Sequence, residues 1–287
     1  MIKRSFRLYN EGGWKAVFSG AKRLYRNKKR NILSFIFQHS NSPQESLYNY
    51  ITIRRRLQPN SDWILTNTSV PIWKLYTTGN LRISEAEITL SVNSYEDLLR
   101  CGGHGEKEVL EDFMTSIQPE DTIWDIGANV GSYSLLAATQ SSSVIAFEPG
   151  AEARQSLKRN AEINELSANI RVVEKALSSW NGEGVLISGE RPGVQKISHE
   201  GDGEPIEVYR GDDLNLPEPD VIKIDVEGEE VEVLLGMEKR LENCRLCYVE
   251  LHTRADSEHV VDKLKEAGLV ITDKFGNDPI LRAERLS

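Results

Sequence analysis

The segment from Asp125 to Gly131 combines an acid, two glycines and an asparagine between two apolar runs. The run before it, Thr122–Asp125, predicts a strand, and the run after it, Gly131–Thr139, predicts a helix. Turn formation alone could explain the glycines and the asparagine, but not an acid so close to the end of a strand. We therefore interpret the segment as a ligand-binding turn.

The residue types in this turn suit a cationic ligand. Gly127 and Gly131 let backbone approach a ligand where a Cβ would collide, and Asn129 tolerates left-handed geometry and can offer its amide. A carboxylate at Asp125 repels a pyrophosphate but suits an ammonium or sulfonium group. A dinucleotide site would need glycines at the first, third and sixth places of G-x-G-x-x-G, and here these places hold Gly127, Asn129 and Ser132.

A second acid follows the next predicted strand, Ser143–Glu148. Glu148 lies 21 residues after Gly127, in Phe147-Glu148-Pro149, and an acid there suits hydrogen bonding to ribose hydroxyls. Dinucleotides and S-adenosylmethionine both carry a ribose. The acid in the first turn therefore favours S-adenosylmethionine as the cofactor.

Two later strand ends carry groups that could act on an acceptor. IKIDVEGEEVEVLLG offers Asp225 and Glu227, and YVELHTR offers Glu250 and His252. One acid could orient a hydroxyl while another removes its proton, and His252 is the first choice as proton acceptor because its intrinsic pKa lies near neutrality. Glu227 could equally be a helix-start acid and His252 a structural histidine. No acid-plus-amide spacing demands a divalent ion, so we expect no metal.

The surrounding pattern predicts the elements that position these residues. A helix over 106–116 precedes the first strand, a helix over 151–164 follows the second, and β hairpins are expected over 180–210. The remaining expected elements are strands over 170–174, 221–225 and 246–251, helices from 226 to about 241 and over 257–267, and a closing hairpin around 275–279. Strands alternating with helices predict an α/β, doubly wound, mostly parallel sheet, with one antiparallel hairpin strand at its edge.

Four stretches resemble the successive motifs of the FkbM-type S-adenosylmethionine-dependent methyltransferases: WDIGANVGSYSLLAA, VIAFEPGAEARQSLKRNAEIN, KALSSWNGEG and PDVIKIDVEGEEVEVLLGM. The resemblance runs from about Glu108 to His252. It implies a class I methyltransferase (Rossmann-like) fold and methylation of oxygen on small molecules, natural products or glycans.

The resemblance also implies roles for individual residues. Glu148 would bind the ribose hydroxyls, Ala176 and Leu177 at the end of the third strand would flank the adenine, and Asp225 would lie beside the transferred methyl. The methionine portion would be held by Asp125, Gly127, Ala128, Asn129 and Gly131.

These observations predict an O-methyltransferase that acts on a hydroxyl or carboxyl of a glycan, a lipid-linked sugar or another small molecule. Two alternatives stay open: an NAD(P)-dependent Rossmann oxidoreductase, and a non-catalytic protein with a vestigial cofactor pocket. A nicotinamide titration separates the first from a methyltransferase. The acceptor pocket is expected from residues 61–107 and 180–210, and His104, in a glycine-rich loop, could lie on a lid.

The N-terminal residues differ in charge from the rest. Residues 1–60 carry thirteen Lys and Arg against Glu11 and Glu45, whereas the whole chain has a net charge of −9. We divide the chain into a basic helical extension (1–60), a β-rich accessory segment with a lid loop (61–107) and a methyltransferase domain (108–287). An amphipathic helix over 12–37 could bind a membrane surface or support self-association, while nucleic acid is an unlikely partner. Only three cysteines are present, which suits a reducing, cytoplasmic setting. The helix over 12–37 adds the possibility that the protein is membrane-associated.

Overall fold

The computed structural model describes residues 78–103, 106–141, 143–188, 195–252, 257–276 and 279–286. These fall into two compact units, one with residues 78–80 and 92–102 and the other with 81–91 and the residues from 103 onward. The predicted helix over 12–37 and the lid residue His104 lie outside the described residues.

The larger unit is built on a seven-stranded sheet with the order β12-β13-β11-β10-β3-β4-β5. Its strands are β3 (Thr122–Ile126), β4 (Ser143–Phe147), β5 (Ile170–Val173), β10 (Val221–Ile224), β11 (Leu246–Glu250), β12 (Val270–Phe275) and β13 (Ile280–Glu284). β3, β4, β5, β10 and β11 pair in parallel, and β13 pairs antiparallel with both β11 and β12. The predicted mostly parallel sheet is confirmed.

The predicted position of the antiparallel strand at the edge is wrong. β13 lies between β11 and β12, so that β12 forms the edge. The burial of the two strands agrees with this order. Ile280, Leu281 and Ala283 of β13 are buried, whereas most of β12 is exposed or half-buried. The more apolar strand of the hairpin takes the inner place.

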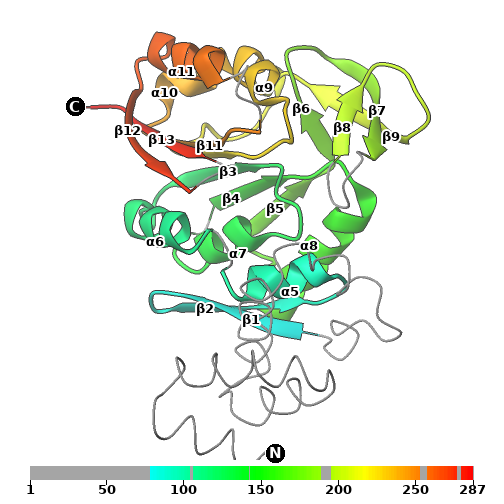
Figure 1. Ribbon diagram of the computed structural model, residues 1–287, viewed down its shortest axis with the longest axis vertical. Coiled ribbons are helices and arrows are strands. Elements are labelled where there is room, and N and C mark those ends of the chain that lie inside the picture. The colour runs from blue at the N-terminus through cyan, green and yellow to red at the C-terminus, as the bar shows by residue number, and fades with distance from the viewer. Residues whose placement is uncertain are drawn as a thin grey trace, which may run out of the picture. The chain divides into compact units, whose positions relative to one another are not determined.

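Helices cover both faces of this sheet, as expected for buried parallel strands (Figure 1). One face carries α6 (Lys107–Ser116), α7 (Ser132–Ala138) and α8 (Ala151–Ile163), and the other carries α9 (Glu230–Gly236), α10 (Glu238–Asn243) and α11 (Ser257–Glu266). The single helix predicted after β10 is two helices, because Met237 leaves helical geometry with a φ of −137°. A Cβ on the preceding Gly236 would lie 1.9 Å from the carbonyl oxygen of Ser178, so backbone from another segment packs against this break.

The main core lies between the sheet and α9, α10 and α11. Its fully buried members come from alternate positions of the strands and from one face of each helix, and they include Trp124, Ile126, Ile222, Ile224, Val249, Val233, Leu234, Leu241, Val260 and Leu264. This packing holds the strand ends that carry the candidate site in fixed register.

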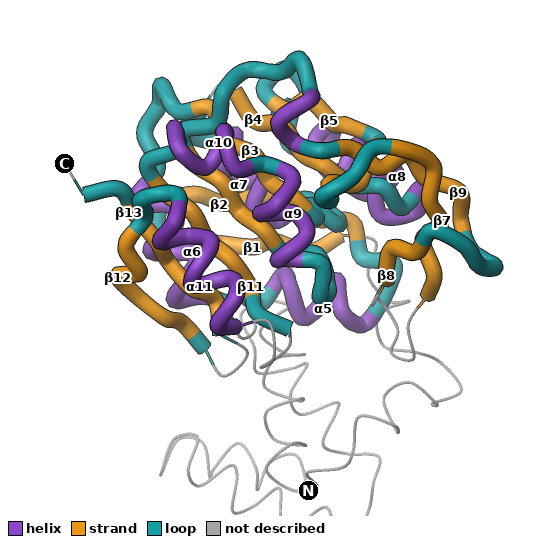
Figure 2. The backbone as a smooth tube through the Cα atoms, turned by 90° about the horizontal axis from the view of Figure 1, so that it is seen from above, coloured by secondary structure: helices purple, strands orange, loops and turns teal. Residues whose placement is uncertain are grey.

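A smaller sheet continues from the edge of the main sheet. Its order is β6-β9-β7-β8, from β6 (Lys175–Leu177), β7 (Gly182–Ser188), β8 (Gln195–Ser198) and β9 (Glu204–Tyr209), and Figure 2 shows β7, β8 and β9 to one side of the main strands. The β hairpins predicted for 180–210 are confirmed. The third predicted strand is shorter than expected: β5 ends at Val173, and Lys175 already belongs to β6, which pairs with β9.

The remaining described elements come before the main sheet in the sequence. β1 (Thr78–Ile83) and β2 (Ala86–Ser91) form a two-stranded sheet within the segment that the sequence analysis expected to be rich in β structure. The side-chain oxygen of Asn160 on α8 accepts hydrogen bonds from the backbone N–H and the hydroxyl of Ser91, both at 2.7 Å. α5 (Tyr95–Cys101) begins with a capping box between Ser94 and Asp97. None of the described helices is long and apolar enough to cross a membrane.

Candidate active site

The turn after β3 is held by the backbone of β4. The N–H groups of Gly127 and Ala128 donate to the carbonyl oxygen of Phe147 at 3.0 and 2.9 Å. Gly127, Asn129 and Gly131 all have left-handed φ values, of 78°, 50° and 93°. Such angles suit glycine and asparagine, so the residue types follow from the shape of the turn.

Gly127 has a second constraint, which the sequence did not reveal. A Cβ at this position would lie 1.8 Å from the carbonyl oxygen of Asp225, at the end of β10. The missing side chain therefore leaves room for the neighbouring strand end of the protein itself. The turn after β3 therefore packs directly against the end of β10, which carries Asp225.

Asp125 is enclosed rather than exposed to a ligand. Its side chain is 1% exposed, and the hydroxyl of Ser134 on α7 donates to its Oδ2 at 2.5 Å. Its Oδ1 lies 3.5 Å from Nζ of Lys223. The carboxylate that the sequence analysis assigned to a ligand cation already faces a cation of the protein.

Lys223 is a residue of the candidate site that the sequence analysis missed. It pairs with Asp125 in register across β3 and β10, and its Nζ lies 3.1 Å from Oδ2 of Asp225. Burial alone would lower the pKa of Lys223, but the carboxylates of Asp225 and Asp125 raise it above its usual value. The available signal was a lysine inside the apolar strand VIKI, since a buried lysine in a strand needs a carboxylate partner.

Glu148 is also held by the protein. Its Oε2 accepts from the backbone N–H of Asn129 and its Oε1 from that of Gly150, both at 2.8 Å. Burial raises the pKa of Glu148, and the two N–H donors oppose that rise. The acid thus links the ends of β3 and β4 and fixes the turn in which Asn129 lies.

The side chains of Ala176 and Leu177 belong to the protein core. Ala176 packs with Leu186, Ile206 and Val208 in the smaller sheet, and Leu177 joins the main core. Any contact with an adenine would therefore involve their backbone, and this role stays a prediction.

The ends of β10 and β11 bring together three of the predicted catalytic residues. Asp225, Glu227 and His252 place one ligand atom each within 4.8 Å of one another. Nε2 of His252 lies 3.6 Å from Oδ1 of Asp225 and 3.5 Å from Oε2 of Glu227. Oε1 of Glu250 lies 3.9 Å from the same Nε2. Residues that are 27 positions apart in the chain thus face one another.

The other ring nitrogen of His252 is held by a residue that the sequence analysis did not select. Nδ1 lies 2.7 Å from Oε1 of Glu230, at the start of α9, and Glu230 is 1% exposed. The backbone N–H of Gly228 donates to the same Glu230 oxygen at 3.0 Å. Glu230 therefore sets the orientation of the imidazole.

These neighbours change the acid–base properties of the cluster. Burial alone would lower the pKa of His252, but the hydrogen bond to Glu230 and the charges of Asp225 and Glu227 raise it to about 9. Burial and the charge of Asp225 raise the pKa of Glu250 to about 8. The intrinsic pKa on which the choice of His252 as proton acceptor rested is therefore shifted upward by these surroundings, and its role as proton acceptor stays a prediction.

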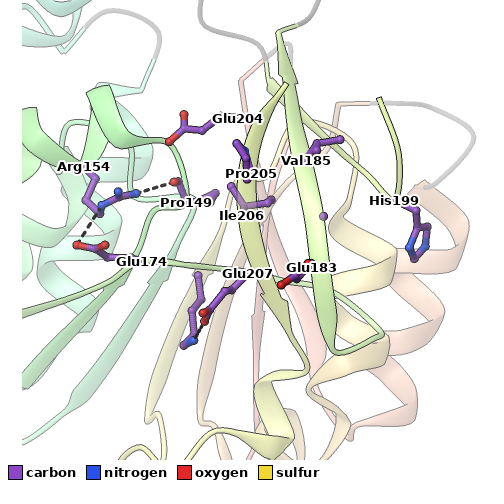
Figure 3. A pocket seen from close by; sticks show the side chains of 12 residues that line it. Pro149, Arg154, Glu174, Glu183, Val185, His199, Glu204, Pro205, Ile206 and Glu207 are labelled. Carbon is purple, nitrogen blue, oxygen red and sulfur yellow. Dashed lines mark hydrogen bonds and ion pairs between the residues drawn. The ribbon is translucent and has the colours of Figure 1, made fainter. Parts of the chain in front are cut away.

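A separate pocket of about 650 Å³ lies between the start of α8 and the smaller sheet (Figure 3). Arg154 contacts Glu174 at 3.3 Å and donates to the carbonyl oxygen of Pro149 at 2.5 Å. The acids among its lining residues are Glu174, Glu183, Glu204 and Glu207, against the bases Arg154 and Lys175. None of the residues that line this pocket belongs to the group at the ends of β10 and β11. Its nearest link to the candidate site is Pro149, which directly follows Glu148.

Two comparisons establish the family. The methyltransferase FkbM domain matches residues 125–271. A relative from Haloferax volcanii, described as hexuronic acid methyltransferase AglP, is 30% identical over 229 residues, which cover 76% of this chain and 91% of the relative. This protein belongs to the FkbM methyltransferase family. The predicted class I methyltransferase fold is thereby confirmed, and the oxidoreductase alternative is set aside.

The matches to solved structures have lower sequence identity. An FkbM methyltransferase from Methylobacillus flagellatus is 12% identical with a TM-score of 0.44, over 88% of this chain and 58% of that chain. Magnesium protoporphyrin IX methyltransferase from Synechocystis, solved with bound S-adenosylmethionine, is 14% identical with a TM-score of 0.45, over 68% of this chain and 86% of that chain.

Proposed function

We propose that this protein transfers a methyl group from S-adenosylmethionine to an oxygen of an acidic sugar within a glycan or a lipid-linked saccharide. The observation that carries the proposal is the match to a hexuronic acid methyltransferase over 91% of that relative's length. The FkbM domain match, over residues 125–271, includes the turn after β3 and the ends of β10 and β11. These strand ends would therefore serve methyl transfer.

The geometry of the β3 turn supports the cofactor. In a doubly wound sheet, ligands bind beyond the carboxyl ends of the strands. The left-handed turn from Gly127 to Gly131 lies at that edge, and Glu148 ties the Asn129 N–H to the end of β4. The side chain of Asn129 is half-buried in this turn and is the group that we assign to the methionine portion.

The cluster at the ends of β10 and β11 supports the acceptor. The sulfonium already activates the methyl group, so the enzyme mainly aligns the acceptor oxygen in line with the methyl carbon and excludes water. A carboxylate acceptor needs no base, whereas a hydroxyl acceptor must lose a proton. Asp225, Glu227, Glu250 and His252 would position the oxygen, and the carboxylates could accept a proton from a hydroxyl.

Cofactor binding can be tested with a substitution that the turn tolerates. Glycine adopts left-handed angles without strain, so Asn129→Gly keeps the turn and removes the amide. S-adenosylmethionine at one hundred times its dissociation constant should stabilise the wild type by about 2.7 kcal/mol, or roughly 5–11 °C in melting temperature. Loss of one hydrogen bond should weaken binding about 2- to 12-fold, measured by calorimetry.

The control is Glu165→Gly, which changes another left-handed residue, with a φ of 60°, just after the end of α8. Its affinity for S-adenosylmethionine should equal that of the wild type. If the wild type shows no shift, or NADH gives the shift instead, the proposal fails. If Asn129→Gly binds normally, the role of Asn129 fails and the proposal stands on the remaining residues.

The acceptor can be tested with methyl-labelled cofactor and glycans that contain hexuronic acids. Label should transfer to these glycans and not to the same glycans after chemical reduction of their carboxyl groups. Mild alkali then distinguishes the product, because a methyl ester releases labelled methanol and a methyl ether does not. Equal labelling of native and reduced glycans would contradict an acidic acceptor.

A further inference from the structure

We propose that Asp225, Glu227 and His252 bind a divalent metal ion at the ends of β10 and β11. The sequence analysis expected no metal, because it found no acid-plus-amide spacing. The tertiary structure supplies a different donor set, in which the imidazole comes from another strand. Two carboxylates and one imidazole suit a first-row divalent cation such as Mn²⁺.

The distances in the cluster fit one shared ion better than hydrogen bonds. Nε2 of His252 faces Asp225 and Glu227 at 3.6 and 3.5 Å, beyond the usual length of about 2.7–3.2 Å for an N–H···O bond. Metal–ligand bonds of about 2.1 Å at angles of about 90–110° would place ligand atoms roughly 3.0–3.5 Å apart. The two distances from Nε2 are thus close to the spacing of ligands around a common centre, and all three ligand atoms lie within 4.8 Å of one another.

The contact between Glu230 and the imidazole of His252 also favours a metal site. Histidines that bind metals usually hold their other ring nitrogen against a carboxylate, which fixes the ring and leaves Nε2 for the ion. Here Glu230 holds Nδ1 at 2.7 Å, and Gly228 in turn donates to that same carboxylate. The buried Glu230 thus acts as a positioning residue for a ligand on β11.

The charge of the cluster supplies the driving force. Four carboxylates, Asp225, Glu227, Glu230 and Glu250, gather near one imidazole, and Lys223 is shared with a fifth carboxylate, that of Asp125. Partly buried carboxylates at this density repel one another. A divalent cation offsets the repulsion at the point where the ligand atoms converge.

The ion would also resolve a conflict in substrate binding. An acidic sugar that approaches Asp225, Glu227 and Glu250 would meet like charges, whereas a cation between them can bind both sides. This role rests on the proposed function. The metal site itself does not, because it requires neither cofactor nor acceptor.

The test uses Mn²⁺ and the full chain, without S-adenosylmethionine or glycan. Loss of the electron paramagnetic resonance signal of free Mn²⁺ should show one bound ion per chain after prior treatment with EDTA. His252→Ala and Asp225→Asn should each weaken binding at least tenfold. Glu230→Gln should weaken it about 10- to 100-fold, as expected for a residue that orients a ligand.

The matched control is His259→Ala, which removes an exposed histidine from α11 and should leave Mn²⁺ affinity unchanged. Melting temperatures in EDTA identify a variant that loses binding because it unfolds, and Asp225→Asn provides the conservative substitution if His252→Ala does so. The proposal is overturned if the wild type binds no Mn²⁺ at millimolar concentration, or if His252→Ala and Asp225→Asn bind it as well as the wild type. A normal cofactor shift in EDTA together with absent Mn²⁺ binding would reject the metal site and leave the methyltransferase proposal intact.

Discussion

Both the turn after β3 and the ends of β10 and β11 gather carboxylates at one edge of the main sheet. The two regions differ in the partners that offset the negative charges of these carboxylates. In the turn, Asp125 faces Lys223 and Ser134, and Glu148 accepts two backbone N–H groups. At the ends of β10 and β11, Asp225, Glu227 and Glu250 converge on one imidazole at 3.5–3.9 Å.

This difference separates two uses of an acid. A carboxylate that is buried with partners from its own chain holds the shape of a site, and removing a partner costs stability. Carboxylates that outnumber the neighbouring cations repel one another in the free protein and favour a positively charged ligand. We therefore expect the first region to act mainly as a scaffold and the second to be the surface at which methyl transfer takes place.

The largest effect is expected where the two regions touch. Gly127→Ala places a methyl group 1.8 Å from the Asp225 carbonyl oxygen, at a φ of 78°, so backbone must move. We expect a loss of about 4 kcal/mol or more in the free energy of unfolding, or no folded protein at all. Urea denaturation monitored by circular dichroism measures the loss.

Gly228→Ala is the matched control. Gly228 also has a left-handed φ, of 105°, but a Cβ there would meet nothing within 4 Å. It should cost only the backbone strain of about 1–3 kcal/mol. Equal costs at the two positions would show that the close approach of the strands does not matter.

A smaller loss is expected from Lys223→Met, which removes the cation shared by Asp125 and Asp225. The change leaves the carboxylate of Asp125 buried without a charge partner, at a cost of about 3–5 kcal/mol. Adding Asp125→Asn to Lys223→Met should recover part of that loss, because the orphaned charge disappears. Denaturant titrations of the two single variants and the double variant give the coupling free energy.

Lys158→Met provides the comparison at the surface. Lys158 pairs with Glu174, but its side chain is 49% exposed, so its removal should change stability by less than about 1 kcal/mol. If Lys223→Met is equally mild, the scaffold role of the buried pair is refuted.

The smallest effect, and one of opposite sign, is expected in the second region. Burial and Asp225 raise the pKa of Glu250 to about 8, so ionising Glu250 destabilises the folded chain. In EDTA at pH 9, Glu250→Gln should therefore raise stability by about 1 kcal/mol, or 2–4 °C in melting temperature. The gain should shrink as the pH falls toward 6, because the folded wild type then keeps the proton.

Glu258→Gln, at an exposed position on α11, should leave the melting temperature unchanged across the same pH range. If Glu250→Gln instead lowers the melting temperature at pH 9, the ionised carboxylate of Glu250 must be stabilised by its neighbours. The contrast between the two regions would then fail.

Much of the fold followed from local patterns. Short apolar runs predicted β3, β4, β10 and β11, and the turn residues between Asp125 and Gly131 marked the edge of the sheet where we propose that the cofactor binds. The order of strands at the sheet edge did not follow, because β12 and β13 have similar lengths and only their burial decides which lies inside. The prediction placed Ala176 and Leu177 at the end of the same strand as Val173, although they belong to a different sheet.

The sequence by itself determined that acids, glycines and a histidine would stand at strand ends, because residue type and period are local properties of the chain. Only the tertiary structure decided which of these groups would meet. Lys223 reaches Asp125 through the register of two strands that are far apart in sequence, and Glu230 turns His252 toward Asp225 and Glu227 across a helix start. Whether an acid holds the fold or faces a ligand depends on these long-range neighbours, since its ionisation energy is set by the charges and burial around it.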